Sequence, residues 1–200
     1  MSVTTEMVRE LRERTGAGVL EVKKALDSTG GDMDAAARIL RDKGLDKAAK
    51  RASRETRQGR VLSYVHGEPG RIGVLLEVNC ETDFVARTGA FQELAHNLAM
   101  QIAATNPQWV RDDDIPADVL EKQRAEYRAE MAEANKPPEI LDRIVDGKMA
   151  KWLDQVVLFR QPYIRDDELA VGQLVIGAIA EIGENIVVRR FSRYELGEQV

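Results

Sequence analysis

The chain has 200 residues, of which 44% are hydrophobic, 5% are aromatic and 32% are charged, and its formal net charge is −5. This composition is typical of a packed globular protein with an aliphatic, helix-rich core and excludes an intrinsically disordered chain. No apolar run reaches the ~18–20 residues of a membrane span, no secretory signal is visible at the start, and the single cysteine, Cys80, excludes an internal disulfide. We therefore expect a cytoplasmic protein without a membrane partner.

Basic side chains are concentrated in residues 38–60, which hold nine lysines or arginines and three acidic residues. This segment carries +6, which leaves −11 on the rest of the chain. Non-specific nucleic-acid binding depends on neutralising phosphates, so a mostly acidic protein is a poor general binder. We expect no specific nucleic-acid partner, and we keep an RNA- or ribosome-binding protein that uses residues 38–60 as the alternative function.

Residues 1–45 predict three short helices separated by glycines. Thr4 or Thr5 is suited to cap the first helix, because a hydroxyl can accept a hydrogen bond from a free amide of the first turn. Asp32 is suited to cap the third helix, which we expect to end at Gly44. So small a core is near the lower limit for independent stability, which favours a recognition domain over a catalytic one.

Two further parts are expected after this first domain, residues 1–45. Residues 46–60 are rich in alanine and basic residues and have few large apolar side chains, which favours an exposed, basic helical connector. Residues 61–200 predict a core of mixed strands and helices, which we expect to carry the main activity.

Strands and helices are segregated in this core. Residues 61–65 and 72–78 are rich in branched apolar side chains and predict a hairpin, and residues 185–194 predict a third strand. A long amphipathic helix is expected from Thr88 to Asn106. We therefore predict the α+β class, with a three-stranded antiparallel sheet packed with helices.

The remaining core segments predict helices. Residues 117–158 are mostly helical in pattern, with expected breaks at residues 135–138 and near Gly147. A last helix is indicated by apolar residues at helical spacing over residues 171–182. Gly183 fits the position just beyond its end.

Motifs for nucleotides, metals and covalent catalysis are incomplete. Residues 16–21 begin like a dinucleotide fingerprint but lack the third glycine, and they follow a predicted helix where that motif needs a strand. The histidines and cysteine, His66, Cys80 and His96, show no metal-ligand spacing. Cys80 with either histidine would supply a nucleophile and a base, yet cysteine in an apolar strand is more often buried. We expect no cofactor, no metal and no catalytic residues, hence no enzyme, and keep a Cys80 hydrolase as a rival.

The most informative segment is residues 79–87, which read NCETDFVAR and follow an apolar strand. Thr82 or Asp83 is suited to cap a helical turn that starts with Phe84 and Val85. Patterning leaves two roles open for Phe84. It is either a hydrophobic staple against the next helix or an aromatic anchor presented to a partner.

Four segments, taken together, resemble the elongation factor Ts family. They are residues 11–26, 35–44, 79–87 and 182–190. The first reads LRERTGAG and then KKAL, and the last reads IGENI followed by two arginines. Because all four occur in the family's order along almost the whole chain, the combination is more specific than any one motif.

This resemblance implies a guanine-nucleotide exchange factor for elongation factor Tu in translation elongation. It implies a UBA-like three-helix domain that grips the GTPase, with partner contacts at Arg12, Val19 and Leu20. Exchange then follows from linkage, because a protein that binds the GDP-loaded GTPase more weakly than the empty one must weaken GDP binding by the same factor. No direct nucleotide binding by this chain is implied.

The resemblance also assigns a role to the loop formed by Thr82, Asp83, Phe84 and Val85. It implies that the loop is inserted beside the partner's Mg²⁺ and phosphate site, with Phe84 as a wedge and Asp83 as a polar contact that holds the loop. The chain resembles the short, single-core form of the family, with no room for a second core subdomain or a coiled-coil insertion. Such a form is expected to complete its core as a homodimer.

Overall fold

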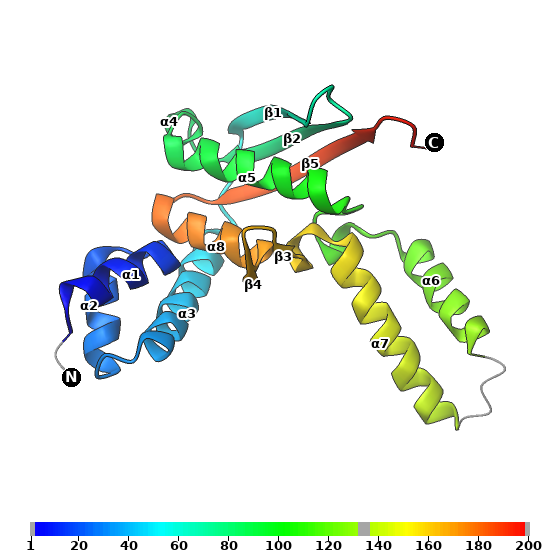
Figure 1. Cartoon of the computed structure of the whole chain (residues 1–200), viewed down its shortest axis with the longest axis horizontal. Helices are drawn as coiled ribbons and strands as arrows, with labels where there is room; N and C mark the ends of the chain where they lie inside the picture. Colours follow the sequence, from blue (N-terminus) through cyan, green and yellow to red (C-terminus); the bar gives the residue numbers. More distant parts are fainter. Residues whose placement is uncertain (1–2, 132–136, 199–200) are drawn as a thin grey trace. The chain divides into compact units, whose positions relative to one another are not determined.

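The computed structural model describes residues 3–131 and 137–198, and it divides into two compact units. The first unit extends to Met100 and resumes at Gln173, and the second comprises residues Gln101–Gly172. Helices and an antiparallel sheet occur together, which confirms the α+β class (Figure 1). Every helix within the described ranges is too short or too polar to cross a lipid bilayer.

Three helices at the start of the chain pack around a small apolar core. They are α1 (Thr5–Thr15), α2 (Val19–Ser28) and α3 (Met33–Arg51). Both predicted caps are confirmed, because the Thr4 hydroxyl accepts a hydrogen bond from an amide of α1 and the Asp32 carboxylate accepts two from α3. The core side chains are Leu11, Val22, Ala25, Leu26, Ala36, Ala37 and Leu40. The UBA-like character of this domain stays a prediction.

The expected end of the third helix at Gly44 is wrong, because α3 continues to Arg51. Gly44 is buried beside α8 (Val171–Ile182), and an added Cβ there would lie 3.9 Å from two side chains of that helix. A glycine costs about 1 kcal/mol in a helix, which tertiary contacts can offset. One such contact is the hydrogen bond that the Arg51 guanidinium donates to the Gly183 carbonyl at 2.9 Å. The predicted connector, residues 46–60, is therefore helical only in its first part.

The main sheet of the described residues has the antiparallel order β1–β2–β5, with β1 at Gln58–His66, β2 at Ile72–Cys80 and β5 at Ile186–Glu195. The three predicted strands are thereby confirmed. Helix α5 (Gly89–Thr105) lies along one face of the sheet (Figure 1), where the Tyr64 and His96 rings meet edge to face at 5.4 Å. The large side chains buried in the sheet and in α5 include Val74, Leu76, Val78, Phe91, Leu94 and Leu98.

The opposite face of the sheet is exposed and partly apolar. Side chains alternate between the two faces of a strand, and the register places Val65 opposite Gly73, which is in turn opposite Tyr194. Leu75 and Val61 point to this same side, away from the buried Val74 and Leu76. The apolar side chains of this face are each exposed over more than half of their surface: Val61, Val65, Leu75 and Tyr194.

The second unit contains a pair of antiparallel helices, α6 (Ala117–Glu130) and α7 (Pro138–Val156). Ion pairs join them along their length, including Arg124 with Asp146 at 2.8 Å. The predicted break near Gly147 is wrong, because α7 runs through that residue.

This helical pair, α6 and α7, confirms the mostly helical pattern predicted for residues 117–158 within the described residues. The helices lie side by side and are joined further by the pairs Arg128–Asp142 and Lys148–Glu130. Of the other predicted break, residues 135–138, the part before Pro137 lies outside the described residues.

Short elements complete the second unit. A two-stranded ribbon of β3 (Pro162–Tyr163) and β4 (Asp166–Ala170) was not predicted, because its strands are too short and too polar to show a pattern. Two 3₁₀ turns flank the helices, η1 (Asp112–Asp114) and η2 (Leu158–Arg160). The buried Gln101 side chain donates to the Pro162 carbonyl at 3.1 Å and so ties the ribbon to the end of α5.

Candidate partner-binding site

The loop of Thr82, Asp83, Phe84 and Val85 follows β2 at once and begins the short helix α4 (Asp83–Ala86). The Thr82 hydroxyl caps this turn by accepting a hydrogen bond from the Val85 amide at 3.3 Å. Asp83 pairs with the guanidinium of Arg87 at 2.6 Å, one turn further on. The loop is therefore an ordered strand-to-helix turn held by its own side chains.

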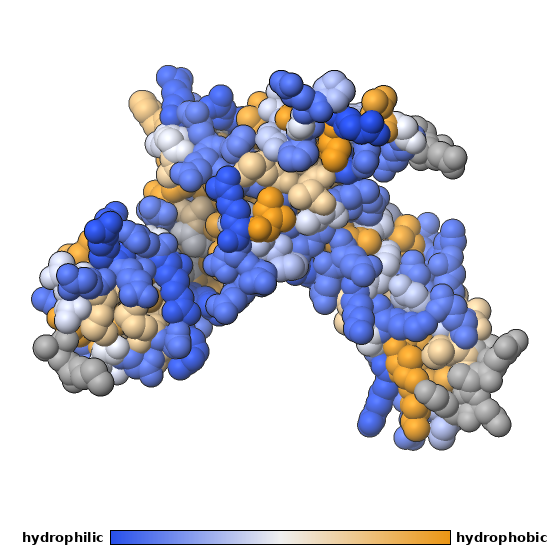
Figure 2. Space-filling model, viewed as in Figure 1, coloured by the Kyte–Doolittle hydropathy of each residue, from blue (hydrophilic) through white to orange (hydrophobic). Residues whose placement is uncertain are grey.

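Phe84 lies on the outside of this turn with 78% of its surface exposed. The staple interpretation is therefore wrong for this structure, and the next side chains to enter the core are Ala86 on α4 and the fully buried Phe91 on α5. Burying a phenylalanine is worth about 1.5–3 kcal/mol, so an exposed one forgoes that stabilisation. Figure 2 shows a mostly hydrophilic visible surface with isolated hydrophobic patches. Aromatic side chains are common anchors of protein interfaces, and an exposed ring on an ordered turn is available for that role.

Cys80, just before the loop, has a buried, protonated thiol. Its Sγ donates to the Thr82 carbonyl at 3.1 Å. Burial, aided by the nearby Glu184 carboxylate, raises the pKa of Cys80 to about 11. The thiolate is the reactive form of cysteine, so at neutral pH this thiol is a poor nucleophile. The state of Cys80 argues against the rival hydrolase, and both candidate bases, His66 and His96, lie beside the Tyr64 ring.

The predicted N-terminal contact residues flank a single turn. Arg12 is in the last turn of α1, and Val19 and Leu20 open α2. Gly16 joins them in a left-handed conformation, with φ of 65°, and its amide donates to the Arg12 carbonyl at 2.9 Å. All three predicted side chains are exposed, and Leu20 is the most exposed of its helix's apolar residues. The fold thus leaves them available to a partner.

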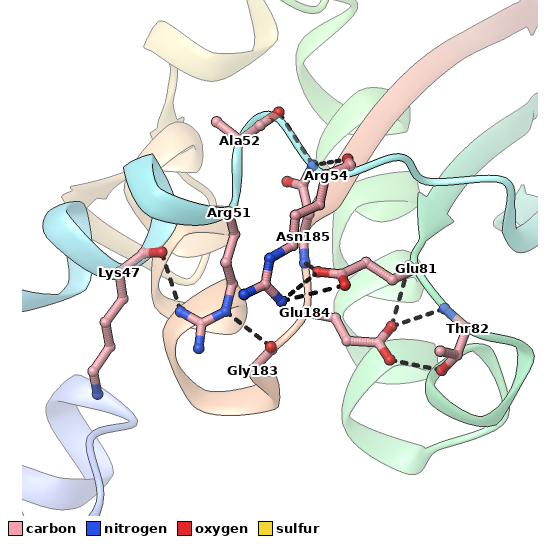
Figure 3. Close-up of polar contacts among 9 residues, drawn as sticks. All are labelled: Lys47, Arg51, Ala52, Arg54, Glu81, Thr82, Gly183, Glu184 and Asn185. Atoms are coloured by element: carbon pink, nitrogen blue, oxygen red, sulfur yellow. Dashed lines mark hydrogen bonds and ion pairs between the residues drawn. The ribbon is translucent and has the colours of Figure 1, made fainter.

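Sequence reasoning missed one contact of the loop. The sequence indicates only a helix end at Gly183 and a strand over residues 185–194, but the Glu184 side chain reaches the backbone and hydroxyl of Thr82 (Figure 3). The sequence did hold a signal for this contact, because the segments 79–87 and 182–190, which both resemble the family, lie at the ends of predicted strands. Pairing of β2 with β5 brings those ends together, with Cys80 opposite Ile186.

Three arginines of the basic segment, residues 38–60, contact acceptor groups within the protein. Arg51 donates to the Gly183 carbonyl and Arg54 lies 3.4 Å from the Glu81 carboxylate (Figure 3). Arg57 pairs with Glu55 at 3.0 Å. These contacts lower the positive charge available to phosphates, which weakens the alternative of an RNA-binding surface here.

Comparison with known proteins identifies relatives along nearly the full chain. A family model described as Elongation factor TS matches residues 46–198. The chain is 52% identical over 198 residues to elongation factor Ts of Thermotoga maritima, covering 99% of this chain and 98% of that protein. It is 48% identical over 198 residues to elongation factor Ts of Thermodesulfovibrio yellowstonii, with the same coverage. The chain therefore belongs to the elongation factor Ts family of translation elongation factors.

Proposed function

We propose that this protein is a guanine-nucleotide exchange factor for elongation factor Tu and that its loop of residues 82–85 acts at the partner's nucleotide site. The exposed Phe84 ring carries the proposal, because it is a large apolar group that an ordered turn presents to solvent. Membership of the elongation factor Ts family supports the choice of partner.

The exchange step requires no covalent chemistry from this chain. Insertion of Phe84 beside the phosphate-binding loop of the GTPase reshapes the backbone that cradles the diphosphate. Displacement of Mg²⁺ then removes the cation that neutralises the phosphate charge. GDP affinity falls by the same factor by which GDP weakens binding of this protein, because the coupling is reciprocal. Asp83 supports the loop through its ion pair with Arg87.

The three N-terminal helices supply a second contact in this proposal. Docking on the GTPase is assigned to Arg12, Val19 and Leu20. Their contact keeps the loop of residues 82–85, called the exchange loop below, at its target. The division into a recognition domain of residues 1–45, a basic connector of residues 46–60 and an exchange core of residues 61–200 belongs to the same proposal.

The first test is stopped-flow release of fluorescent GDP from the cognate elongation factor Tu. We expect the release rate to rise with the concentration of this protein and then to saturate, as it must when release occurs within a complex. Release after chelation of Mg²⁺ by EDTA serves as a control that the GTPase is intact. Folded protein that leaves the release rate unchanged at every concentration would reject the proposed function.

We also propose that a second copy of the chain covers the exposed face of the sheet, giving a homodimer. Val61, Val65, Leu75 and Tyr194 form an apolar surface there, and apolar surface in one plane favours association. Sedimentation equilibrium should give twice the chain mass for the wild type and a shift toward the single chain for Leu75→Lys. Ala125→Lys, at an exposed site on α6, is the matched control and should leave the mass unchanged. A wild-type protein that sediments as one chain at all concentrations contradicts this proposal.

A further inference from the structure

Glu184 lies in the turn between α8 and β5 and holds the start of the exchange loop (Figure 3). One carboxylate oxygen, Oε2, accepts hydrogen bonds from the amides of Glu81 and Thr82 at 3.1 and 3.0 Å. The other oxygen, Oε1, accepts one from the Thr82 hydroxyl at 2.6 Å. A single side chain thus holds three donors of the segment that leads to Phe84.

These two amides lie where β2 leaves the sheet. The last pair in the register of β2 with β5 is Cys80 with Ile186, so the amides of Glu81 and Thr82 lie beyond the strand ladder. An ionised acceptor makes hydrogen bonds roughly twice as strong as those of a neutral acceptor. Glu184 therefore continues the anchoring of the backbone past the point at which strand pairing ends.

The turn that carries Glu184 is itself anchored on both sides. Before it, Gly183 adopts a left-handed conformation with φ of 86°, which ends α8 and reverses the chain. After it, the Asn185 amide donates to the Glu81 carboxylate at 2.7 Å. The buried Asn185 side chain donates to the carbonyls of Ala52 and Arg54, at 3.4 and 2.9 Å. The turn that carries Glu184 is thus held by the end of α8, by the segment that follows α3 and by the Glu81 side chain at the start of the loop.

We propose that Glu184 is a positioning residue for nucleotide exchange, which orders the backbone at Glu81 and Thr82 so that Phe84 is presented in one orientation before the partner binds. This inference rests on the proposed exchange function. A loop that is ordered in the free protein loses less conformational entropy on binding, so more of the contact energy of Phe84 is available to weaken GDP. Glu184 does not need to touch the GTPase or the nucleotide in this role.

Three variants test the role of the carboxylate. Glu184→Ala removes all three acceptor contacts, and we expect the saturating rate of GDP release to fall about tenfold, with the concentration at half-saturation nearly unchanged. Glu184→Gln keeps an oxygen for the two amides and loses the charge, so about a threefold loss is expected. Glu121→Ala removes an exposed carboxylate on α6 and should release GDP at the wild-type rate.

Coupling to Phe84 separates positioning from general destabilisation. In a Phe84→Ala background, Glu184→Ala should cause no further loss of release rate, because the ring to be positioned is absent. If the loss of release rate caused by Glu184→Ala adds fully to the loss caused by Phe84→Ala, the inference is overturned. It is also overturned if Glu184→Ala alone releases GDP at the wild-type rate. If Glu184→Ala does not fold, the same comparison is made with Glu184→Gln, alone and combined with Phe84→Ala.

Amide hydrogen exchange in the free protein tests the ordering without the partner. In Glu184→Ala the amides of Glu81 and Thr82 should exchange about tenfold faster than in the wild type, whereas Glu121→Ala should leave them unchanged. Unchanged protection at both amides overturns the inference whatever the release rates are. Wild-type protein that does not accelerate GDP release rejects the proposed function instead, and faster amide exchange would then still show that Glu184 orders the loop.

Discussion

Phe84→Ala is expected to reduce the saturating rate of GDP release by about 30-fold or more, the effect typical of removing a central aromatic anchor. The ring is 78% exposed in the free protein, so its removal should change the free energy of unfolding by less than about 0.5 kcal/mol. The affinity for the GTPase should fall by a smaller factor than the rate of GDP release, because the contacts of Arg12, Val19 and Leu20 are unchanged. Stopped-flow GDP release and a separate titration of complex formation measure the two effects.

A matched control is available in the second unit. Ile164 is also a large exposed apolar residue, 45% exposed, and Ile164→Ala removes apolar surface at a site with no assigned role. Its release rate should equal that of the wild type. If Phe84→Ala released GDP as fast as Ile164→Ala, the proposed role of Phe84 as a wedge would be rejected, even if the exchange function itself were established.

Gly59→Ala is expected to give the largest loss of stability, about 3–5 kcal/mol in the free energy of unfolding. Gly59 lies in β1 opposite Asn79 with φ of 147°, which disfavours any residue with a side chain. An added Cβ would lie 2.2 Å from the Val78 carbonyl oxygen and 2.7 Å from the Asn79 Cα. Both obstacles are backbone atoms of the paired strand, so relief requires part of the β1–β2 ladder to separate.

Gly73→Ala is the matched control in the neighbouring strand. Gly73 also lies in the sheet, but a Cβ there would meet no heavy atom of the described residues within 4 Å. We expect its free energy of unfolding to stay within about 0.5 kcal/mol of the wild type. Equilibrium urea unfolding of both variants measures the difference, and equal stabilities for the two would contradict the steric argument.

Local features of the chain were predictable from the sequence because their interactions span only a few residues. The Thr4 and Asp32 caps join a side chain to amides two or three residues away. The end of α8 at Gly183 depends on the conformation of that one glycine. The strands around residues 61–65 and 72–78 follow from runs of branched apolar side chains. The four segments that resemble the elongation factor Ts family could be recognised for the same reason, because each is a short continuous stretch of the sequence.

Other features of the structure depend on contacts between residues that are far apart in the sequence, and these could not be predicted from local patterns. The glycines Gly44 and Gly147 suggest helix ends, yet α3 and α7 continue through them because neighbouring helices stabilise these segments. Glu184 meets Thr82 across 102 positions of the chain, and the pairing of β2 with β5 brings them together. Whether Phe84 is buried or exposed likewise depends on how the turn after β2 is held. A side chain's role in such places follows from tertiary packing, which local patterns do not encode.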